Sequence, residues 1–181
     1  MKTHQIFLIL LLSCISASAC FAQTDYSTTH VIQGDGYTYQ CDNKHGGMAK
    51  LYNSNDQFTY AKWIRKDGVP IDEAFLFTRT ITNGFEGREK ADQIVRQIFN
   101  TEELNSVRES PLRLMVTMII NPDTGKVDEV NFEFPVPSGY SRVPVEKYRQ
   151  IELTIKQNIT FSITEAGKKL NYCTTALFFE P

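Results

Sequence analysis

Two stretches in the second half of the chain alternate apolar and polar residues. The alternation runs from Leu112 to Ile120 and again from Val130 to Phe134, and turn-forming residues fill positions 121–126 between them. Alternation with a period of two places the apolar side chains on one face of a strand. The pattern therefore predicts a β-hairpin with one buried face.

Apolar residues recur at spacings of three and four in two other segments, which is typical of amphipathic helices. The first segment spans residues 86–100, and the second follows Pro144 and ends near Ile159. Proline is favoured in the first turn of a helix, so Pro144 marks a helix start. Residues 170–179 are aromatic and β-branched and are predicted to form a last strand. The predicted order is therefore helix, strand, strand, helix, strand.

The region before the first helix is rich in aromatic and β-branched residues separated by turn formers, which predicts strands. The expected strands span residues 30–33, 36–41, 48–52, 58–64 and 75–81. We therefore expect an α+β fold in which an antiparallel sheet packs against two helices over residues 83–181. A strand-rich meander over residues 23–82 precedes this region, and the two are expected to form one compact unit.

Residues 1–22 show the features of a cleavable secretory signal peptide in the expected order. Lys2 lies at the front, an apolar run covers residues 6–12, and small residues precede Gln23. This run is shorter than the roughly 20 apolar residues that cross a bilayer. The sequence therefore predicts an exported protein that acts in the periplasm or outside the cell.

The processing of this leader has more than one reading. Cleavage after Ala22 fits the small residues that the peptidase requires, and cleavage after Ala19 is the alternative. Lipid attachment at Cys20 or Cys14 is a further alternative, but the residues before each cysteine fit the lipidation pattern less well. We expect cleavage after Ala22 and regard a lipid-anchored form as the minor alternative.

Charge and hydropathy exclude two classes of partner. The formal net charge is −2 and the sequence pI is about 5.9, so the chain has no basic field that would attract a phosphate backbone. No window after the leader is long and apolar enough to span a membrane. We expect neither a nucleic-acid partner nor a membrane span in the mature chain.

Of the four cysteines, Cys41 and Cys173 remain after cleavage of the leader. In an oxidising compartment a disulfide between this single pair is one of two equal alternatives, and its long loop would contribute roughly 4 to 5 kcal/mol to stability. The other is two buried, unpaired thiols that act as small apolar side chains. In both cases the cysteines are structural.

Two short motifs match catalytic signatures. Asp123-Thr124-Gly125 has the tripeptide of aspartic proteases, and His45-Gly46-Gly47 resembles the oxyanion-forming glycines of esterases. The first occurs once and lies in a predicted turn, where turn chemistry explains the same residues. The second lacks the Gly-x-Ser-x-Gly elbow that it would need. We therefore expect no catalytic residues at either motif.

One group of residues has the chemistry of metal ligands. Cys41, Asp42 and His45 lie close together in the sequence, but a closed zinc site needs four ligands and a catalytic one needs three and a water. After leader cleavage His30 is the other remaining histidine, so ligands are scarce. We expect no metal and no cofactor.

Carboxylates cluster at residues 72–73 and again in the predicted hairpin. Glycosidases hold two carboxyl groups roughly 5 to 9 Å apart in a cleft, so such clusters are candidate active sites. In a strand, Glu129 and Glu133 share a face opposite Asp128, which indicates the solvated side of a half-exposed sheet. We expect a solvated face at the hairpin.

Aromatic residues of the first region form a second candidate surface, because exposed rings at alternate strand positions can bind a sugar or a peptide. The residues concerned are Tyr37, Tyr39, Tyr52, Phe58, Tyr60 and Trp63. At least half of them are expected to pack in the core instead.

The second half of the chain has a regular order of predicted elements. It runs from a long strand that begins at Leu112, through the turn Asp123-Thr124-Gly125-Lys126-Val127, to a second strand, a helix and a last aromatic strand that ends at Phe179. This order resembles the C-terminal domain of TonB-type energy transducers, and with the preceding helix the resemblance covers about residues 86–179. The resemblance implies a helix packed across the sheet and a sheet edge that accepts a peptide. It implies the fold and not energy transduction, since the proline-rich spacer and the retained membrane anchor of that family are absent. Residues 23–82 look like an uncharacterised exported family of Gram-negative bacteria.

Two functions of different classes follow from these observations. The first is a non-enzymatic binding or adaptor protein of the cell envelope that recognises a protein or an extended peptide by strand addition. The alternative is a small hydrolase or carbohydrate-binding protein that acts on an envelope or dietary substrate, with carboxylates such as Asp72 and Glu73 in a cleft. An unpaired strand would favour the first function, and acids that converge in a pocket with raised pKa values would favour the second.

Overall fold

The computed structural model of the protein describes residues 24–43 and 47–181, so the expected signal peptide lies outside the described residues. The described strands form one antiparallel sheet in the order β1-β2-β3-β5-β4-β6. The strands are β1 His30–Gly34, β2 Tyr37–Asp42, β3 Met48–Asn53, β4 Leu114–Ile120, β5 Val127–Pro135 and β6 Cys173–Phe179. The fold is therefore α+β, as predicted.

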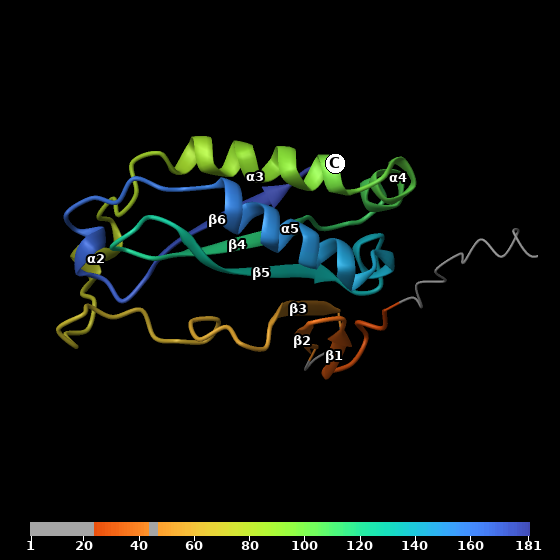
Figure 1. Ribbon diagram of the computed structural model, residues 1–181, viewed down its shortest axis with the longest axis horizontal. Helices are drawn as coiled ribbons and strands as arrows, with labels where there is room; N and C mark the ends of the chain where they lie inside the picture. Colours follow the sequence, from red (N-terminus) through yellow and green to blue (C-terminus); the bar gives the residue numbers. More distant parts are fainter. Residues whose placement is uncertain (1–23, 44–46) are drawn as a thin grey trace, which may run out of the picture.

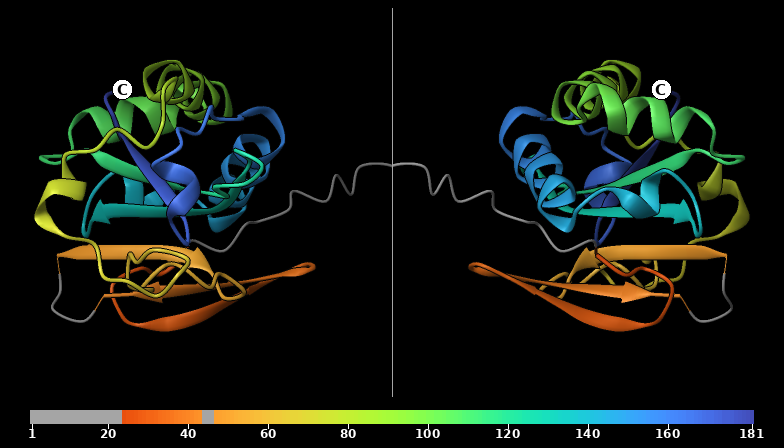
Figure 2. Two further views of the ribbon diagram at one scale, coloured as in Figure 1. Left: turned by 90° about the vertical axis from the view of Figure 1, so that its left-hand side faces the viewer. Right: turned by 90° about the vertical axis from the view of Figure 1, so that its right-hand side faces the viewer.

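Two long helices cover one face of this sheet, as Figures 1 and 2 show. The helices are α2 Glu73–Leu76, α3 Gly84–Ile98, α4 Thr101–Arg108 and α5 Val145–Asn158, with the short 3-10 turns η1 Tyr140–Arg142 and η2 Gly167–Lys169. Helices α3 and α5 agree with the predicted amphipathic segments, and Pro144 is the N-cap residue of α5. No helix in the described ranges is long and apolar enough to cross a bilayer.

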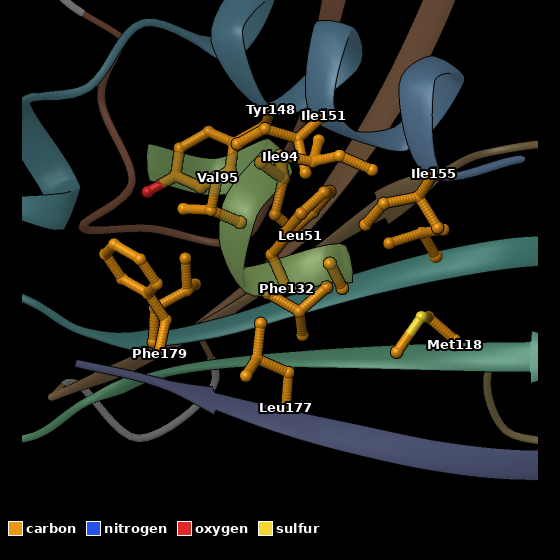
Figure 3. Close-up of a cluster of buried hydrophobic side chains, with 14 of the residues drawn as sticks. Leu51, Ile94, Val95, Met118, Phe132, Tyr148, Ile151, Ile155, Leu177 and Phe179 are labelled. Atoms are coloured by element: carbon orange, nitrogen blue, oxygen red, sulfur yellow. The ribbon is translucent and has the colours of Figure 1, made fainter. Parts of the chain in front are cut away.

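The apolar core lies between the sheet and these two helices. Alternate residues of β4 are fully buried, which is the pattern expected of a strand with one core face. Figure 3 shows Tyr148, Ile151 and Ile155 of α5 gathered around Phe132 and Leu51 of the sheet. The side chains buried by alternation on the strands and those buried along one face of α5 therefore form one cluster.

Tyr148 of α5 is fully buried and contacts aromatic rings from several other parts of the chain. Its ring stacks on Phe134 with a centroid distance of 5.2 Å and contacts Tyr26 edge to face at 6.1 Å. Its hydroxyl donates a hydrogen bond to the carbonyl oxygen of Tyr140 at 2.9 Å, so the buried polar group is satisfied. Tyr26 belongs to the extended segment before β1, which is thereby fixed to α5.

The two regions predicted from the sequence share the sheet. Strands β1, β2 and β3 form the predicted meander, and β4 and β5 form the predicted hairpin. Strand β3 pairs with β5 from Met48 opposite Pro135 to Leu51 opposite Phe132. This short ladder joins residues 23–82 to the second half of the chain.

Two predicted strands, 58–64 and 75–81, are wrong. Residues 75–76 belong to the short helix α2, whose N-cap Asp72 accepts a hydrogen bond from the backbone N–H of Phe75 at 2.8 Å. The segment 58–64 is irregular, and its aromatic residues make tertiary contacts instead of a strand ladder. The indole N–H of Trp63, for example, donates to the carbonyl oxygen of Tyr172 at 3.0 Å.

Helix α4 is absent from the sequence prediction, although its start carries a readable signal. Asn100 and Glu103 form a capping box in which each side chain accepts a hydrogen bond from the other residue's backbone N–H. This arrangement satisfies two donors that a helix start leaves unpaired. The local sequence was therefore sufficient to predict a helix here.

The possible disulfide between Cys41 and Cys173 is not formed. Cys41 and Cys173 are both buried and free. They lie on β2 and β6, and the three strands β3, β5 and β4 separate them. Strands are spaced about 4.8 Å apart, which places the two cysteines well beyond the roughly 7 Å limit between Cα atoms for a disulfide. The alternative of two buried thiols is therefore the one observed.

The turn between β4 and β5 provides a test of this fold. Gly125 has φ 71°, and a Cβ added there would lie 2.0 Å from the carbonyl oxygen of Phe161. We expect Gly125→Ala to lower the free energy of unfolding by about 3 kcal/mol or more, because backbone must move. Gly36→Ala is the matched control, since Gly36 has φ 72° but nothing within 4 Å, and should cost only about 1 kcal/mol. Equal losses in urea unfolding would contradict the close approach.

Candidate functional site

The face of the sheet turned away from α3 and α5 carries polar residues of β5. Sequence reasoning placed Glu129 and Glu133 together on a solvated face opposite Asp128. The structure corrects this for Glu129, which is 5 % exposed, whereas Asp128 is exposed. Glu129 is buried because residues 54–63 cross this face as a second layer, which we call the outer segment.

The outer segment is anchored on the Glu129 carboxylate. The backbone N–H of Gln57 donates to its Oε1 at 2.6 Å, and the N–H of Phe58 donates to its Oε2 at 3.0 Å. Burial raises the pKa of Glu129, and these two hydrogen bonds oppose that rise because they favour the charged form. Thr59 adds a hydrogen bond from its hydroxyl to the side-chain oxygen of Asn131 at 3.2 Å.

Aromatic residues complete the cover of this polar face. The hydroxyls of Tyr60 and Tyr52 both donate to Oδ2 of Asp42, at 2.6 and 3.0 Å. The ammonium of Lys50 lies over the Tyr60 ring and pairs with Glu133 at 3.2 Å. These two tyrosines thus belong to a hydrogen-bonded layer and do not form the flat platform that the sequence suggested.

The remaining members of the predicted aromatic platform are divided between core and surface. Tyr39 is fully buried, Tyr37 and Trp63 are partly buried, and the ring of Phe58 contacts Tyr172 at 5.1 Å. The expectation that at least half of these rings pack inside is therefore consistent with the structure. They do not gather into one exposed surface.

A cleft of about 450 Å³ opens where β3 ends beside the outer segment and α5. Its lining residues are Asn53, Asn55, Asp56, Gln57, Phe58, Asp128, Glu129, Arg149, Leu153 and Lys156. Asp56 Oδ2 is buried there and has no hydrogen-bond partner in the described part of the chain. Burial first, and then the nearby charges of Glu129 and Glu152, raise the pKa of Asp56 to about 7.

The α5 wall of the cleft rests on a buried carboxylate. Glu152 is fully buried and accepts hydrogen bonds from Arg149 at 2.8 Å and from Lys156 at 3.2 Å. The hydroxyl of Tyr39 donates to the same carboxylate. Burial and the charge of Glu152 raise the pKa of Tyr39, so this tyrosine stays neutral. Arg149 lies three residues before Glu152 and Lys156 four residues after it, so both cations are held beside the same carboxylate on α5.

Sequence reasoning missed this cleft, although one signal for it was present. The apolar stripe of α5 runs through Tyr148, Ile151 and Ile155, and Glu152 lies within the same stripe. A charged residue on a buried helix face needs paired partners, and Arg149 and Lys156 are at the right spacing. Asp56 had no comparable signal, because its neighbours come from distant parts of the chain.

A second hollow, of about 480 Å³, lies between α3 and β6 at the edge of the sheet. Its lining residues are Phe85, Arg88, Glu89, Asp92, Gln93, Ala176, Leu177 and Phe178. We call it the edge groove. Strand β6 pairs with β4 on its inner side, and no described backbone group pairs with its outer side.

The motifs singled out in the sequence occupy structural positions. Asp123 is exposed in the turn between β4 and β5, where Lys66 pairs with it at 2.6 Å. The side-chain oxygen of Asn121 accepts hydrogen bonds from the N–H groups of Asp123 and Thr124, as turn chemistry predicts. Asp72 and Glu73 lie at the start of α2 and do not form a carboxylate pair in a cleft.

The metal candidate stays incomplete. His45 lies outside the described residues, so the structure does not place the third candidate ligand beside Cys41 and Asp42. Among residues 24–43 and 47–181, no group of three histidine, cysteine or acidic residues is arranged to hold a metal ion.

The geometry defines an α+β protein with helices on one face of its sheet and an irregular layer on the other. The chain belongs to a family described as "Domain of unknown function (DUF5043)", which matches residues 23–177. It is similar to the crystal structure of a DUF5043 family protein from Bacteroides uniformis ATCC 8492 at 1.85 Å resolution, with a TM-score of 0.76 and 36% identity. That match covers 86% of this chain and 93% of the other. No curated protein matches the chain.

The predicted resemblance to TonB-type transducers is not confirmed, because neither of these matches is to such a protein. The predicted membership of an uncharacterised family agrees with the family description. The cleft and the edge groove are therefore the features of this protein that bear on its function.

The network on α5 leads to a test of stability. We expect Glu152→Ala to lower the free energy of unfolding by about 3 to 5 kcal/mol, because it leaves Arg149, Lys156 and Tyr39 without their buried partner. Glu133→Ala is the matched control, since it breaks a half-exposed pair with Lys50 and should cost less than about 1 kcal/mol. A small loss for both variants in urea unfolding would contradict the buried network.

Proposed function

We propose that the protein is a non-enzymatic binding or adaptor protein of the cell envelope that recognises an extended peptide as an added strand beside β6. The observation that carries this proposal is the character of β6 as an edge strand. Its seven residues, Cys173–Phe179, contain no charge and no proline. Natural proteins normally protect such an edge with lysine, proline, a bulge or a covering element.

The backbone of β6 supplies the binding groups. In an antiparallel ladder, residues of an edge strand direct part of their N–H and C=O groups away from the paired neighbour. No described backbone group pairs with these outward groups. A peptide in an extended conformation would satisfy them in register, which is the source of affinity in strand addition.

Side chains of the edge groove supply selectivity. Phe85 on α3 and Phe178 on β6 are 62% and 59% exposed and lie on its two sides. Arg88 and Asp92 are already engaged, with Thr175 and Arg96 respectively. Phe178 lies on the opposite face of β6 from the buried Leu177 and Phe179, so successive residues of an added strand would meet Phe85 and Phe178 on different faces. We therefore expect a partner segment with neighbouring apolar residues at this point.

The compartment follows from the leader and is part of the same proposal. Cleavage after Ala22 would release the protein into the periplasm or the extracellular space, where an envelope protein or peptide is the expected partner. A lipid-anchored form would place the same groove at a membrane surface. A glycan is the alternative ligand.

The alternative function is a small hydrolase, with carboxylates such as Asp72 and Glu73 in a cleft, or a carbohydrate-binding protein that uses acids and aromatic rings. Asp72 instead caps α2, and Glu73 lies exposed in its first turn. The remaining converging acids, Asp56 and Glu129, include one carboxylate that is already bound by two backbone N–H groups. The edge strand is for these reasons the better supported basis for function.

Site-specific photo-crosslinking in the native envelope tests this proposal. A photoreactive phenylalanine analogue replaces Phe178 in the edge groove and, as the matched control, Phe77, which is 90% exposed outside it. We expect an adduct at position 178 that is absent at 77 and that maps to an extended segment of one partner. The synthetic segment should then slow amide exchange across β6.

Phe178→Lys, which adds a protective charge to the edge, should reduce binding of that segment at least about tenfold, and Phe77→Lys should leave it unchanged. Equal adducts at both positions, or a segment that leaves β6 exchange unaltered, would contradict strand addition.

A further inference from the structure

The cleft beside Asp56 has two walls of opposite charge. Asp56 on the outer segment and Asp128 on β5 supply carboxylates, and Arg149 and Lys156 on α5 supply cations. Positions 149, 153 and 156 are spaced by four and three residues, so they lie on one face of α5. A volume of about 450 Å³ is within the range of roughly 300–1,000 Å³ typical of small-molecule sites.

The acidic wall lacks a hydrogen-bond donor. Buried polar atoms almost always have a partner, yet Asp56 Oδ2 is buried without one in the described part of the chain. The charged groups that face Asp56 from β5 and α5 are Asp128, Glu129, Arg149, Glu152 and Lys156. The donor that best complements a carboxylate among other carboxylates is a cation, because it adds a hydrogen bond and offsets the repulsion.

The basic wall keeps donors to spare. Each cation donates one hydrogen bond to Glu152, but an ammonium has three N–H groups and a guanidinium has five. The side chains of Arg149 and Lys156 remain 24% and 31% exposed, so they reach the open part of the cleft. These groups favour a carboxylate on the ligand.

We propose that this cleft binds a small zwitterion, an α-amino acid or a dipeptide, with its ammonium at Asp56 and its carboxylate at Lys156 and Arg149. Phe58 and Leu153, which also line the cleft, would contact the apolar part of the ligand. This site is separate from the edge groove, since β4 and β5 lie between β3 and β6 in the sheet. The proposal therefore does not depend on strand addition.

Binding should weaken in acid. The pKa of Asp56 lies near 7, so below that pH the side chain gains a proton and loses the charge that holds the ammonium. Affinity is then expected to fall by up to about tenfold per pH unit as the pH decreases below 7. At pH 8 the carboxylate is ionised and binding should be strongest.

Calorimetric titration of the purified protein tests the assignment. The probes are the standard amino acids and, for the tightest binder, its dipeptide, its N-acetyl derivative and its amide. We expect one or more free amino acids or the dipeptide to bind at pH 8, and the N-acetyl form and the amide each to bind at least about tenfold more weakly. Equal binding of all forms, or no binding of any amino acid or dipeptide, would overturn the proposal.

Two variants assign the walls. Asp56→Asn should weaken binding of the free ligand at least about tenfold and remove the pH dependence, whereas Asp67→Asn, which removes one charge from an exposed pair with Arg65, should change neither. Lys156→Gln should abolish the discrimination between the free ligand and its amide. Unaltered pH dependence in Asp56→Asn would overturn the role of Asp56. Peptide crosslinking at Phe178 is unaffected by either result, so the two proposals fail independently.

Discussion

The Glu129 carboxylate holds two backbone N–H groups of the outer segment, and the layer on the second face of the sheet depends on this contact. A charged acceptor makes such hydrogen bonds worth about 1.5 to 3 kcal/mol each, which offsets the cost of burying Glu129. From this anchor the segment continues across the face, and Tyr60 reaches Asp42 at 2.6 Å. The carbonyl of Ala61 then accepts a hydrogen bond from the Tyr172 hydroxyl at 3.0 Å.

This anchor also shapes the cleft. Because the β3–β5 ladder ends at Leu51 opposite Phe132, the first half of β5 lacks a strand neighbour on that side. The outer segment contacts this part of β5 through the Glu129 carboxylate instead of a strand ladder, and it brings Asp56 near Glu129 and the cations of α5. The cleft and the edge groove therefore have different origins: one follows from a ladder that ends early, and the other from the last strand of the sheet.

The parts of the fold that repeat locally could be predicted from the sequence. The alternation of apolar residues from 112 to 120 and the apolar stripe from Tyr148 to Ile155 each depend only on the type of one element and on which of its faces is buried. Residues 58–64 could not be assigned in this way, because aromatic composition suits both a strand and a covering layer. The choice depends on where β3 leaves β5. The separation of Cys41 from Cys173 is likewise a property of strand order, which the spacing of the cysteines does not contain.

Amide hydrogen exchange at Gln57 and Phe58 measures the anchor most directly. The account predicts that both amides are protected in the native protein and exchange much faster in Glu129→Ala, while Glu133→Ala leaves them unchanged. The ladder between β4 and β5 should stay protected in both variants. Continued protection of Gln57 and Phe58 in Glu129→Ala would show that the outer segment is held by other contacts and would contradict the account.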